Sequence, residues 1–220
     1  MRQLLLDLTQ APAPTFSNFV PGRSAEALLA ARSAAAGAMK EPVLYLWGEP
    51  GSGKTHLLRA VCAEADGAMF VRGAEYAGQE TARVLVIDDV DHLREPAQIA
   101  LFNAFNEGRH RLMVVSARAA PREVALRRDL ATRLALGLTY RLHALTDDEK
   151  RDALAAHARV RGFALSDEVR AYLLTHTRRD MPSLIATLDA LDRYSLETGR
   201  PVTVPLLREA LRPAQGTLTP

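Results

Sequence analysis

Residues 48–56 read GEPGSGKTH, and they directly follow the apolar run VLYLW at positions 43–47. A strand, a tight glycine-rich turn and a helix start, in this order, bring backbone N–H groups against phosphate oxygens. In this pattern Lys54 supplies a positive charge to the β- and γ-phosphates, and the Thr55 hydroxyl is a ligand for Mg²⁺. The stretch therefore predicts a nucleotide-binding loop formed by Gly48, Glu49, Pro50, Gly51, Ser52, Gly53, Lys54, Thr55 and His56.

A second part of the site is predicted at positions 84–89, which read VLVIDD. The apolar, β-branched run is typical of a buried parallel strand, and open α/β sheets bind ligands at the C-terminal ends of such strands. Asp88 is the expected outer contact to the Mg²⁺ that Thr55 binds, and Asp89 is placed to orient or polarise an attacking water. Taken alone, the two carboxylates fit an acidic turn equally well, but the phosphate loop favours the nucleotide site.

Strands and helices alternate between residues 43 and 142, which predicts an α/β fold with a parallel sheet wrapped by helices. Strands are expected at 43–47, 68–71, 84–87, 112–116 and 138–142, and helices at 24–39, 53–64, 95–107 and 127–134. Only helical patterns follow, at 146–161, 166–177, 182–198 and 204–211, and the first of them opens with a capping box at Thr146. We therefore expect an α/β core at residues 15–143 and a small all-helical lid at residues 146–213.

Composition narrows the class of protein. The chain has 220 residues and a net charge of +2 without a basic block, which argues against a polycationic nucleic-acid binder. Cys62 is the single cysteine, so an intrachain disulfide is excluded, and the histidines lack the spacing of metal ligands. No apolar run approaches the ~20 residues of a membrane span. The N-terminal apolar stretch is too short for a signal peptide and Asp7 interrupts it, so a cytoplasmic protein is expected.

The order of these motifs resembles that of the AAA+ ATPases of the DnaA/Hda clade. The segment TFSNFV at 15–20 resembles the lead-in of this clade, LATRL at 130–134 resembles the segment that carries its arginine finger, and residues 161–168 and 187–193 resemble its lid. The resemblance implies a P-loop AAA+ core, ADP or ATP and Mg²⁺ as cofactors, and the initiator DnaA as a partner. Whether the chain forms a homodimer or a larger assembly stays open.

The resemblance also implies roles for side chains outside the loop. Arg133 corresponds to the finger, which enters the nucleotide site of a neighbouring subunit, and Arg127 and Arg128 are alternatives for the same role. Ser116 ends the strand that carries a sensor residue in this clade. The predicted catalytic residues are therefore Arg133, Asp89 and Ser116.

The lid departs from the clade at one position. Pro182 stands where a second sensor arginine is usual, and a proline cannot make an electrostatic contact with phosphate. Arg178 and Arg179 are candidates to replace it, although an exposed cationic helix end fits them equally well. This departure favours a protein that holds nucleotide with weak or no intrinsic ATPase activity.

Residues 1–10 are expected to form a separate tail, because Pro and Ala at positions 11–14 set them apart. Spacing alone favours a strand or helix that packs its leucines on the core. The spacer and the resemblance instead imply the short peptide that docks on the β sliding clamp of DNA polymerase III. In that mode Gln3 forms hydrogen bonds within a pocket of the clamp. The side chains that fill an apolar groove beside it are Leu4, Leu6 and Leu8.

The expected function is that of a regulator of chromosomal replication initiation. Bound to nucleotide and tethered to the clamp, it would stimulate ATP hydrolysis by DnaA through a finger supplied in trans and so prevent re-initiation. One alternative is a DnaC-like helicase loader or a self-sufficient AAA+ ATPase acting on single-stranded DNA, and another is an adaptor that holds nucleotide only as a structural ligand. Only residues 213–220 follow the last predicted helix, so sequence-specific DNA binding is not expected, and neither is a membrane partner.

Overall fold

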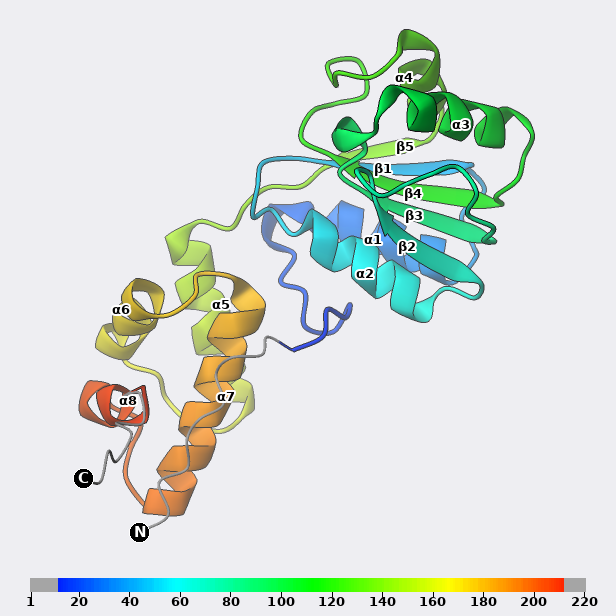
Figure 1. Ribbon diagram of the computed structural model, residues 1–220. Helices are drawn as coiled ribbons and strands as arrows, with labels where there is room; N and C mark the ends of the chain where they lie inside the picture. The colour runs from blue at the N-terminus through cyan, green and yellow to red at the C-terminus, as the bar shows by residue number, and fades with distance from the viewer. Residues whose placement is uncertain (1–11, 212–220) are drawn as a thin grey trace, which may run out of the picture. The chain divides into compact units, whose positions relative to one another are not determined.

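The computed structural model describes residues 12–211, so the predicted clamp-binding residues Gln3, Leu4, Leu6 and Leu8 lie outside the described part of the chain. The described residues divide into two compact units, one that spans residues 14–145 and one that begins at Thr146 (Figure 1). Each unit has its own hydrophobic core, and each is described by itself below.

The first unit is built on a five-stranded parallel sheet, as predicted. Its strands are β1 (Val43–Trp47), β2 (Ala68–Arg72), β3 (Val84–Asp88), β4 (Leu112–Ala117) and β5 (Leu138–Arg141), in the spatial order β2-β3-β4-β1-β5. The three central strands are almost wholly buried, which explains why they read as continuous apolar runs, whereas burial alternates along β5 at the edge. In the register of β1 with β4, Trp47 pairs with Ala117, so these strands end together at the start of the phosphate loop.

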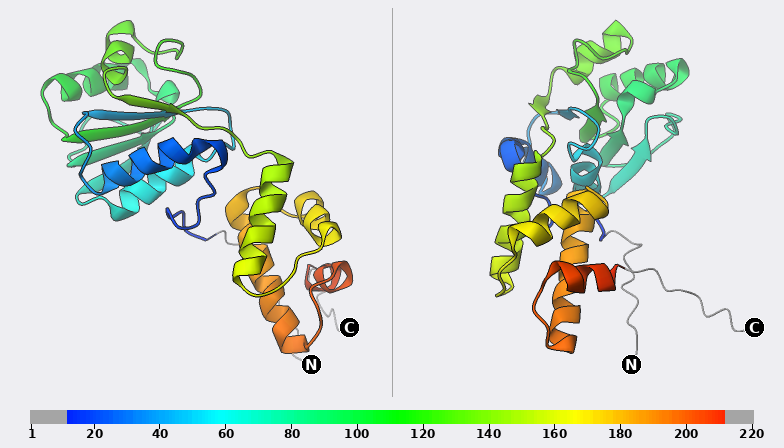
Figure 2. Two further views of the ribbon diagram at one scale, coloured as in Figure 1. Left: turned by 180° about the vertical axis from the view of Figure 1, so that it is seen from behind. Right: turned by 90° about the vertical axis from the view of Figure 1, so that its left-hand side faces the viewer.

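Two helices cover each face of this sheet. The helices α1 (Ala25–Ala35) and α2 (Lys54–Glu64) pack on one face, and α3 (Glu95–Asn106) and α4 (Arg128–Leu134) pack on the other (Figures 1 and 2). Short 3₁₀ turns, η1 (Gly22–Ser24) and η2 (Val90–His92), precede α1 and follow β3. The helix predicted at 24–39 is shorter than expected, because the chain turns at Gly37, which has a φ of 70°.

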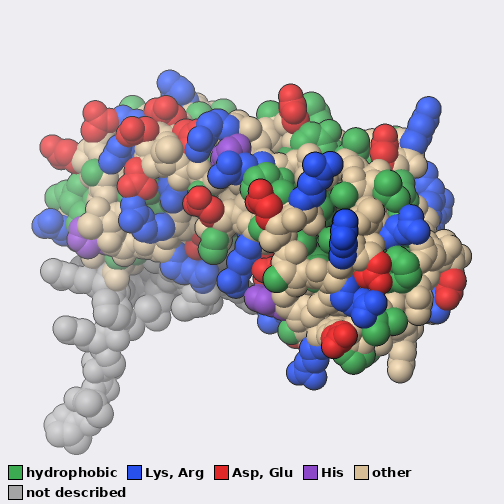
Figure 3. All heavy atoms as spheres, turned by 90° about the horizontal axis from the view of Figure 1, so that it is seen from above, with side chains coloured by type: hydrophobic (Ala, Val, Ile, Leu, Met, Phe, Trp, Pro, Cys, Tyr) green, Lys and Arg blue, Asp and Glu red, His purple; other side chains and the backbone are tan. Residues whose placement is uncertain are grey.

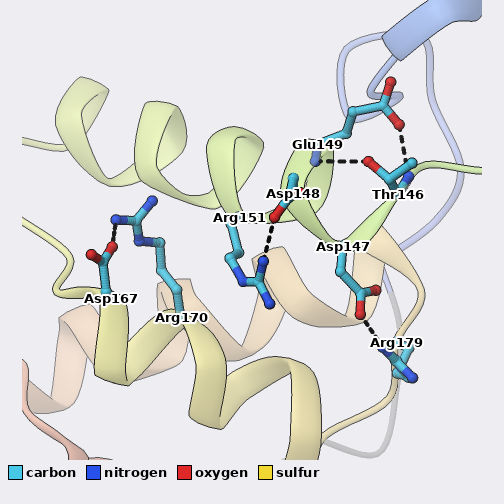
Figure 4. Close-up of polar contacts among 8 residues, drawn as sticks. All are labelled: Thr146, Asp147, Asp148, Glu149, Arg151, Asp167, Arg170 and Arg179. Atoms are coloured by element: carbon cyan, nitrogen blue, oxygen red, sulfur yellow. Dashed lines mark hydrogen bonds and ion pairs between the residues drawn. The ribbon is translucent and has the colours of Figure 1, made fainter.

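The described part of the second unit contains four helices, as predicted for the lid. They are α5 (Asp147–Val160), α6 (Asp167–His176), α7 (Met181–Thr198) and α8 (Val204–Ala210). The predicted capping box is present at α5, where the Glu149 N–H donates to the Thr146 hydroxyl over 3.2 Å and the Thr146 N–H donates to the Glu149 carboxylate over 2.7 Å (Figure 4). Buried leucines from all four helices form the core of the unit: Leu154, Leu173, Leu184, Leu188, Leu191 and Leu206.

Ion pairs tie the elements of the lid together. Arg179, just before α7, donates to Asp147 in the first turn of α5 over 2.6 Å (Figure 4). Arg178 pairs with Asp180 at 3.2 Å. Exposed pairs of this kind contribute only about 0.2–1 kcal/mol each. Their larger consequence is that both candidate replacements for a sensor arginine are engaged with carboxylates of the lid itself.

The surface carries mixed charge. On the face shown in Figure 3, Lys and Arg side chains are interspersed with Asp and Glu, in line with the net charge of +2. No helix within residues 12–211 combines the length and the hydropathy that a membrane-spanning segment requires.

Candidate functional site

The glycine-rich loop between β1 and α2 has the backbone that phosphate binding requires. Gly48 and Gly53 have φ values of 154° and 94°. A Cβ atom at Gly48 would lie 2.2 Å from the Leu142 carbonyl oxygen, and one at Gly53 would lie 2.7 Å from a ring carbon of Phe19. Both positions therefore need glycine for the close approach of neighbouring groups as well as for the backbone conformation.

Lys54 opens α2 and lies over this loop. Its ammonium donates to the carbonyl oxygens of Gly48 (2.8 Å) and Glu49 (3.0 Å), and the residue is only 6% exposed. Burial lowers the pKa of the Lys54 ammonium, while the carboxylates of Asp89, Asp88 and Asp91 act in the opposite direction. The Ser52 hydroxyl oxygen in the same loop is buried and has no hydrogen-bond partner among the described residues. A buried cation beside an unpartnered hydroxyl fits a phosphate group, which is charged and accepts hydrogen bonds.

The two predicted Mg²⁺ ligands lie side by side. The Thr55 hydroxyl donates to Asp88 Oδ2 over 2.7 Å, and Asp88 is only 4% exposed. Hydroxyl and carboxylate oxygens are the ligands that Mg²⁺ prefers, and Mg²⁺ is usually held by one or two side chains together with phosphates and water. Within residues 12–211 no group of three His, Cys, Asp or Glu side chains could hold a metal by itself. The donor set therefore fits Mg²⁺ accompanied by a nucleotide.

Ser116 connects β4 to the carboxylates at the end of β3. Its hydroxyl donates to Asp88 Oδ1 over 2.6 Å and accepts a hydrogen bond from the Asp89 N–H over 2.8 Å. The structure thus brings three predicted residues (Asp88, Asp89 and Ser116) together. The hydroxyl predicted to act as a sensor is engaged with the Asp88 carboxylate and the Asp89 backbone.

Asp89 has an unusual backbone and an unusual carboxyl group. Its φ of 56° lies in the left-handed region, and it is the only non-glycine residue with positive φ in the described part of the chain. Such a conformation costs on the order of 1–3 kcal/mol and is often found at functional sites. Burial raises the pKa of the Asp89 carboxyl, and the charges of Asp88 and Asp91 raise it further. A raised pKa makes this carboxylate a better proton acceptor, as the predicted role near water requires.

The lead-in segment is fixed to the start of α2 through His56. The imidazole Nε2 lies 2.8 Å from the Thr15 carbonyl oxygen, which can only accept, so Nε2 carries the proton. The ring of Phe19 lies 5.4 Å from the His56 ring, and Phe16 is buried in the core beneath α1 and α2. These contacts place the lead-in beside the phosphate loop.

Acidification is expected to weaken this contact. Burial lowers the pKa of His56, although its hydrogen bond to Thr15 acts in the opposite direction. The unfolded chain therefore binds more protons than the folded one between the folded pKa and the unfolded value of about 6.5, and stability must fall as the pH drops through that window. Urea unfolding at pH 7.5 and at pH 5.5 should show a smaller loss of stability for His56→Gln than for the wild type. An equal loss in both proteins would contradict the attribution of this pH dependence to His56. The matched control is His176→Gln, which replaces a histidine at the exposed end of α6.

The three candidate finger residues have different surroundings. Arg133 on α4 is half-buried, with its guanidinium 5.9 Å from the centre of the Phe102 ring on α3. Arg127 pairs with Asp129 at 2.9 Å and with Glu95 at 3.7 Å. The Arg128 side chain is exposed and makes no ion pair within residues 12–211. None of the three contacts the phosphate loop of its own chain in the described structure.

An open hollow of about 500 Å³ lies next to these arginines. It is lined by Arg127, Arg128, Asp129 and Thr132. Leu136, two residues beyond the last residue of α4, is 57% exposed. The start of α4 therefore presents charged groups to solvent, and the residues beyond its last turn present an apolar side chain.

Sequence reasoning missed two residues near the phosphate loop. Arg118 directly follows β4, and its Nε lies 3.7 Å from Asp91 Oδ2. The Asp91 Oδ1 atom is buried without a hydrogen-bond partner among residues 12–211. The signal available in the sequence was position alone, since Arg118 lies two residues beyond Ser116 and Asp91 lies two residues beyond Asp89.

Comparison with known proteins agrees with this geometry. The family model described as the bacterial DnaA ATPase domain matches residues 11–76, and the one described as the Hda lid domain matches residues 147–211. The two matches fall on the phosphate-loop part of the first unit and on nearly all of the described second unit.

Solved structures of AAA+ proteins resemble the chain. Domain III of the Thermotoga maritima replication initiation protein DnaA is 22% identical with a TM-score of 0.64, over 92% of this chain and 98% of that one. AMPPCP-bound DnaA from Aquifex aeolicus is 21% identical with a TM-score of 0.65, over 84% of this chain and 67% of that one. The Thermotoga maritima RuvB Holliday junction branch migration motor is 17% identical with a TM-score of 0.59, over 91% of this chain and 71% of that one.

At these identities the structural matches establish the fold, and they confirm the predicted α/β AAA+ core with a helical lid. The two family models add a similarity in sequence, because one describes the bacterial DnaA ATPase domain and the other describes the Hda lid domain. The chain therefore has the fold of an AAA+ protein, with a nucleotide-binding part similar to that of DnaA and a lid similar to that of Hda.

Proposed function

We propose that this protein restrains chromosomal replication initiation by stimulating ATP hydrolysis on the initiator DnaA, to which it supplies Arg133 in trans. The observation that carries the proposal is that the Arg133 side chain is packed in place but has no ion pair in the described structure. Arg133 packs over Phe102 and has no ion-pair partner within residues 12–211, so its positive charge is available to another molecule. An arginine delivered to a neighbour's γ-phosphate stabilises the charge that develops during phosphoryl transfer.

The surroundings favour Arg133 over the other two candidates. The charge of Arg127 is already shared with Asp129 and Glu95. Arg128 is unpaired, but nothing in the described structure restrains its exposed side chain, so ordering it on a partner costs side-chain entropy. Arg133 is half-buried against an aromatic ring, which restricts its motion without neutralising it.

The protein's own nucleotide site has a supporting role in this proposal. Lys54 and the loop would hold the phosphates of ADP or ATP, and Thr55 and Asp88 would hold Mg²⁺, which neutralises phosphate charge when it is bound. Weak or absent intrinsic hydrolysis is supported by the Ser116 hydroxyl, which is engaged with Asp88 and Asp89. Nucleotide then serves mainly to keep the unit that carries Arg133 in one conformation.

Tethering to the β sliding clamp completes the proposal, and its support comes from the sequence of residues 3–8. Burying three leucines contributes at most about 5–9 kcal/mol. Association also costs translational and rotational freedom, so an affinity no tighter than about micromolar is expected. A tether of modest affinity still raises the effective concentration of Arg133 near DnaA on clamp-loaded DNA.

The direct test is ATP turnover by purified DnaA, measured with and without this protein and with and without clamp loaded on DNA. Stimulation that requires all of the components is the expected result. Rapid turnover by this protein alone, unaffected by DnaA, would instead support the self-sufficient ATPase. Stimulation that persists without the clamp would remove the tether from the proposal and leave the finger in place.

A further inference from the structure

The backbone of Arg118 is fixed beside the phosphate loop. Its predecessor Ala117 ends β4, and the Ala117 carbonyl oxygen accepts a hydrogen bond from the Gly48 N–H over 3.2 Å. Gly48 is the first residue of the loop, so Arg118 leaves the sheet at the point where the loop begins. At this edge of a parallel sheet, residues that follow a strand are well placed to contact a ligand.

The side chain of Arg118 is held only loosely where it lies. It is 60% exposed, and its Nε is 3.7 Å from Asp91 Oδ2, a distance too long for a hydrogen bond. One guanidinium nitrogen is 3.4 Å from Nε2 of His92. Asp91 is not satisfied either, because its second carboxylate oxygen is buried without a partner in the described structure. Both members of the pair therefore retain hydrogen-bonding capacity that the pair does not use.

The positive charge of Arg118 acts on the Lys54 ammonium in the phosphate loop. Burial is the main cause of the lowered pKa of Lys54, and Asp89, Asp88 and Asp91 oppose it, but the positive charge of Arg118 adds to the lowering. Two cations that repel one another at the mouth of the loop are both stabilised by an anion placed between them. A phosphate group offers more charge than one carboxylate, and its oxygens match the fork of donors on a guanidinium.

We propose that Arg118 exchanges Asp91 for the terminal phosphate of a nucleoside triphosphate bound at this chain's own loop, so that this pair distinguishes triphosphate from diphosphate. The inference rests on nucleotide binding at residues 48–55 as proposed above, and it is independent of the action of Arg133 on another protein. Asp91 holds the guanidinium near the loop in the diphosphate form and releases it in the triphosphate form. Arg118 is then the residue through which this protein senses its own nucleotide.

The test compares affinities rather than turnover. The dissociation constants of ADP and of a non-hydrolysable ATP analogue are measured by equilibrium titration on the full chain, for the wild type, for Arg118→Ala and for Arg122→Ala. Arg122 is the matched control, because it is an exposed arginine of the same loop with no ion pair within residues 12–211. Loss of a charge-assisted contact should weaken binding of the analogue to Arg118→Ala by about ten-fold or more while changing ADP binding by less than about three-fold. Equal effects on both nucleotides, or an effect as small as that of Arg122→Ala, would overturn the inference.

Asp91→Asn tests the exchange itself. Removing the competing carboxylate should tighten binding of the analogue relative to ADP, and this gain in discrimination should vanish when Arg118→Ala is also present. A gain that persists in the double variant would contradict the exchange, because Asp91 would then act without Arg118. If the wild-type chain binds neither nucleotide, both this inference and the proposed nucleotide site are wrong. Unchanged discrimination in Arg118→Ala would remove only this inference and would leave the role of Arg133 to its own assay.

Discussion

Arg133→Ala should reduce the stimulated rate of ATP hydrolysis by DnaA by about 10³-fold or more, to the rate that DnaA shows alone. The expected size follows from the effect of arginine fingers supplied in trans, which raise phosphoryl transfer by about 10³–10⁵-fold. Binding of nucleotide to this protein should be unchanged, because Arg133 contacts Phe102 and not the phosphate loop. The measurement is single-turnover hydrolysis of ATP bound to DnaA, in the presence of clamp loaded on DNA.

Arg127→Ala and Arg128→Ala are the matched controls for this experiment, since both lie within one turn of the start of α4. They should retain most of the stimulation. If Arg128→Ala removes it instead, the finger is Arg128, and if none of the three does, the trans mechanism is wrong. Loss of the contact with Phe102 should cost only about 0.5–1 kcal/mol of folding stability, so the variant should remain folded, which thermal unfolding will check.

Lys54→Ala should weaken nucleotide binding by about 100-fold. The substitution removes a charge-assisted contact to phosphate, which contributes about 1.5–3 kcal/mol. Titration with a fluorescent nucleotide will measure the affinity. Nucleotide at 100 times the wild-type dissociation constant should stabilise the wild-type fold by about 2.7 kcal/mol and should stabilise the variant far less.

The control for this prediction is Lys40→Ala, which removes an exposed lysine just before β1 and should leave nucleotide binding unchanged. Lys54 is buried and donates to two loop carbonyls, so its loss also affects the loop itself. Unfolding of both variants without nucleotide separates this effect from binding. Wild-type affinity in a folded Lys54→Ala protein would show that the loop is not the phosphate site.

The fold could be predicted because its signals are local. The central strands β1, β3 and β4 are buried on both faces, and burial of this kind produces the continuous apolar runs that mark them in the sequence. The glycines at 48 and 53 predict the turn between β1 and α2, and the capping box at Thr146 predicts the start of α5. The helix α1 was the least accurate prediction, since its alanine-rich sequence continues to favour a helix beyond the turn at Gly37.

The site could be predicted only in part, because much of it depends on residues that are far apart in the chain. Asp88 and Asp89 could be placed at a strand end, but nothing local indicates that Ser116 would bond to both of them from the next strand. The left-handed backbone of Asp89 and the pairing of Arg118 with Asp91 likewise arise from how two loops meet. The roles assigned to Arg133 and to residues 3–8 stay predictions, since they concern partners that act from outside the chain.

The Asp88 carboxylate is bonded on one oxygen by Thr55 and on the other by Ser116. The Thr55 hydroxyl could offer a lone pair to Mg²⁺ while its proton still points to Asp88, because a hydroxyl group both donates and accepts. Ser116 holds the other carboxylate oxygen of Asp88 in place. The groups that would hold the metal are thus oriented in advance, and their hydrogen bonds would not have to break to admit it.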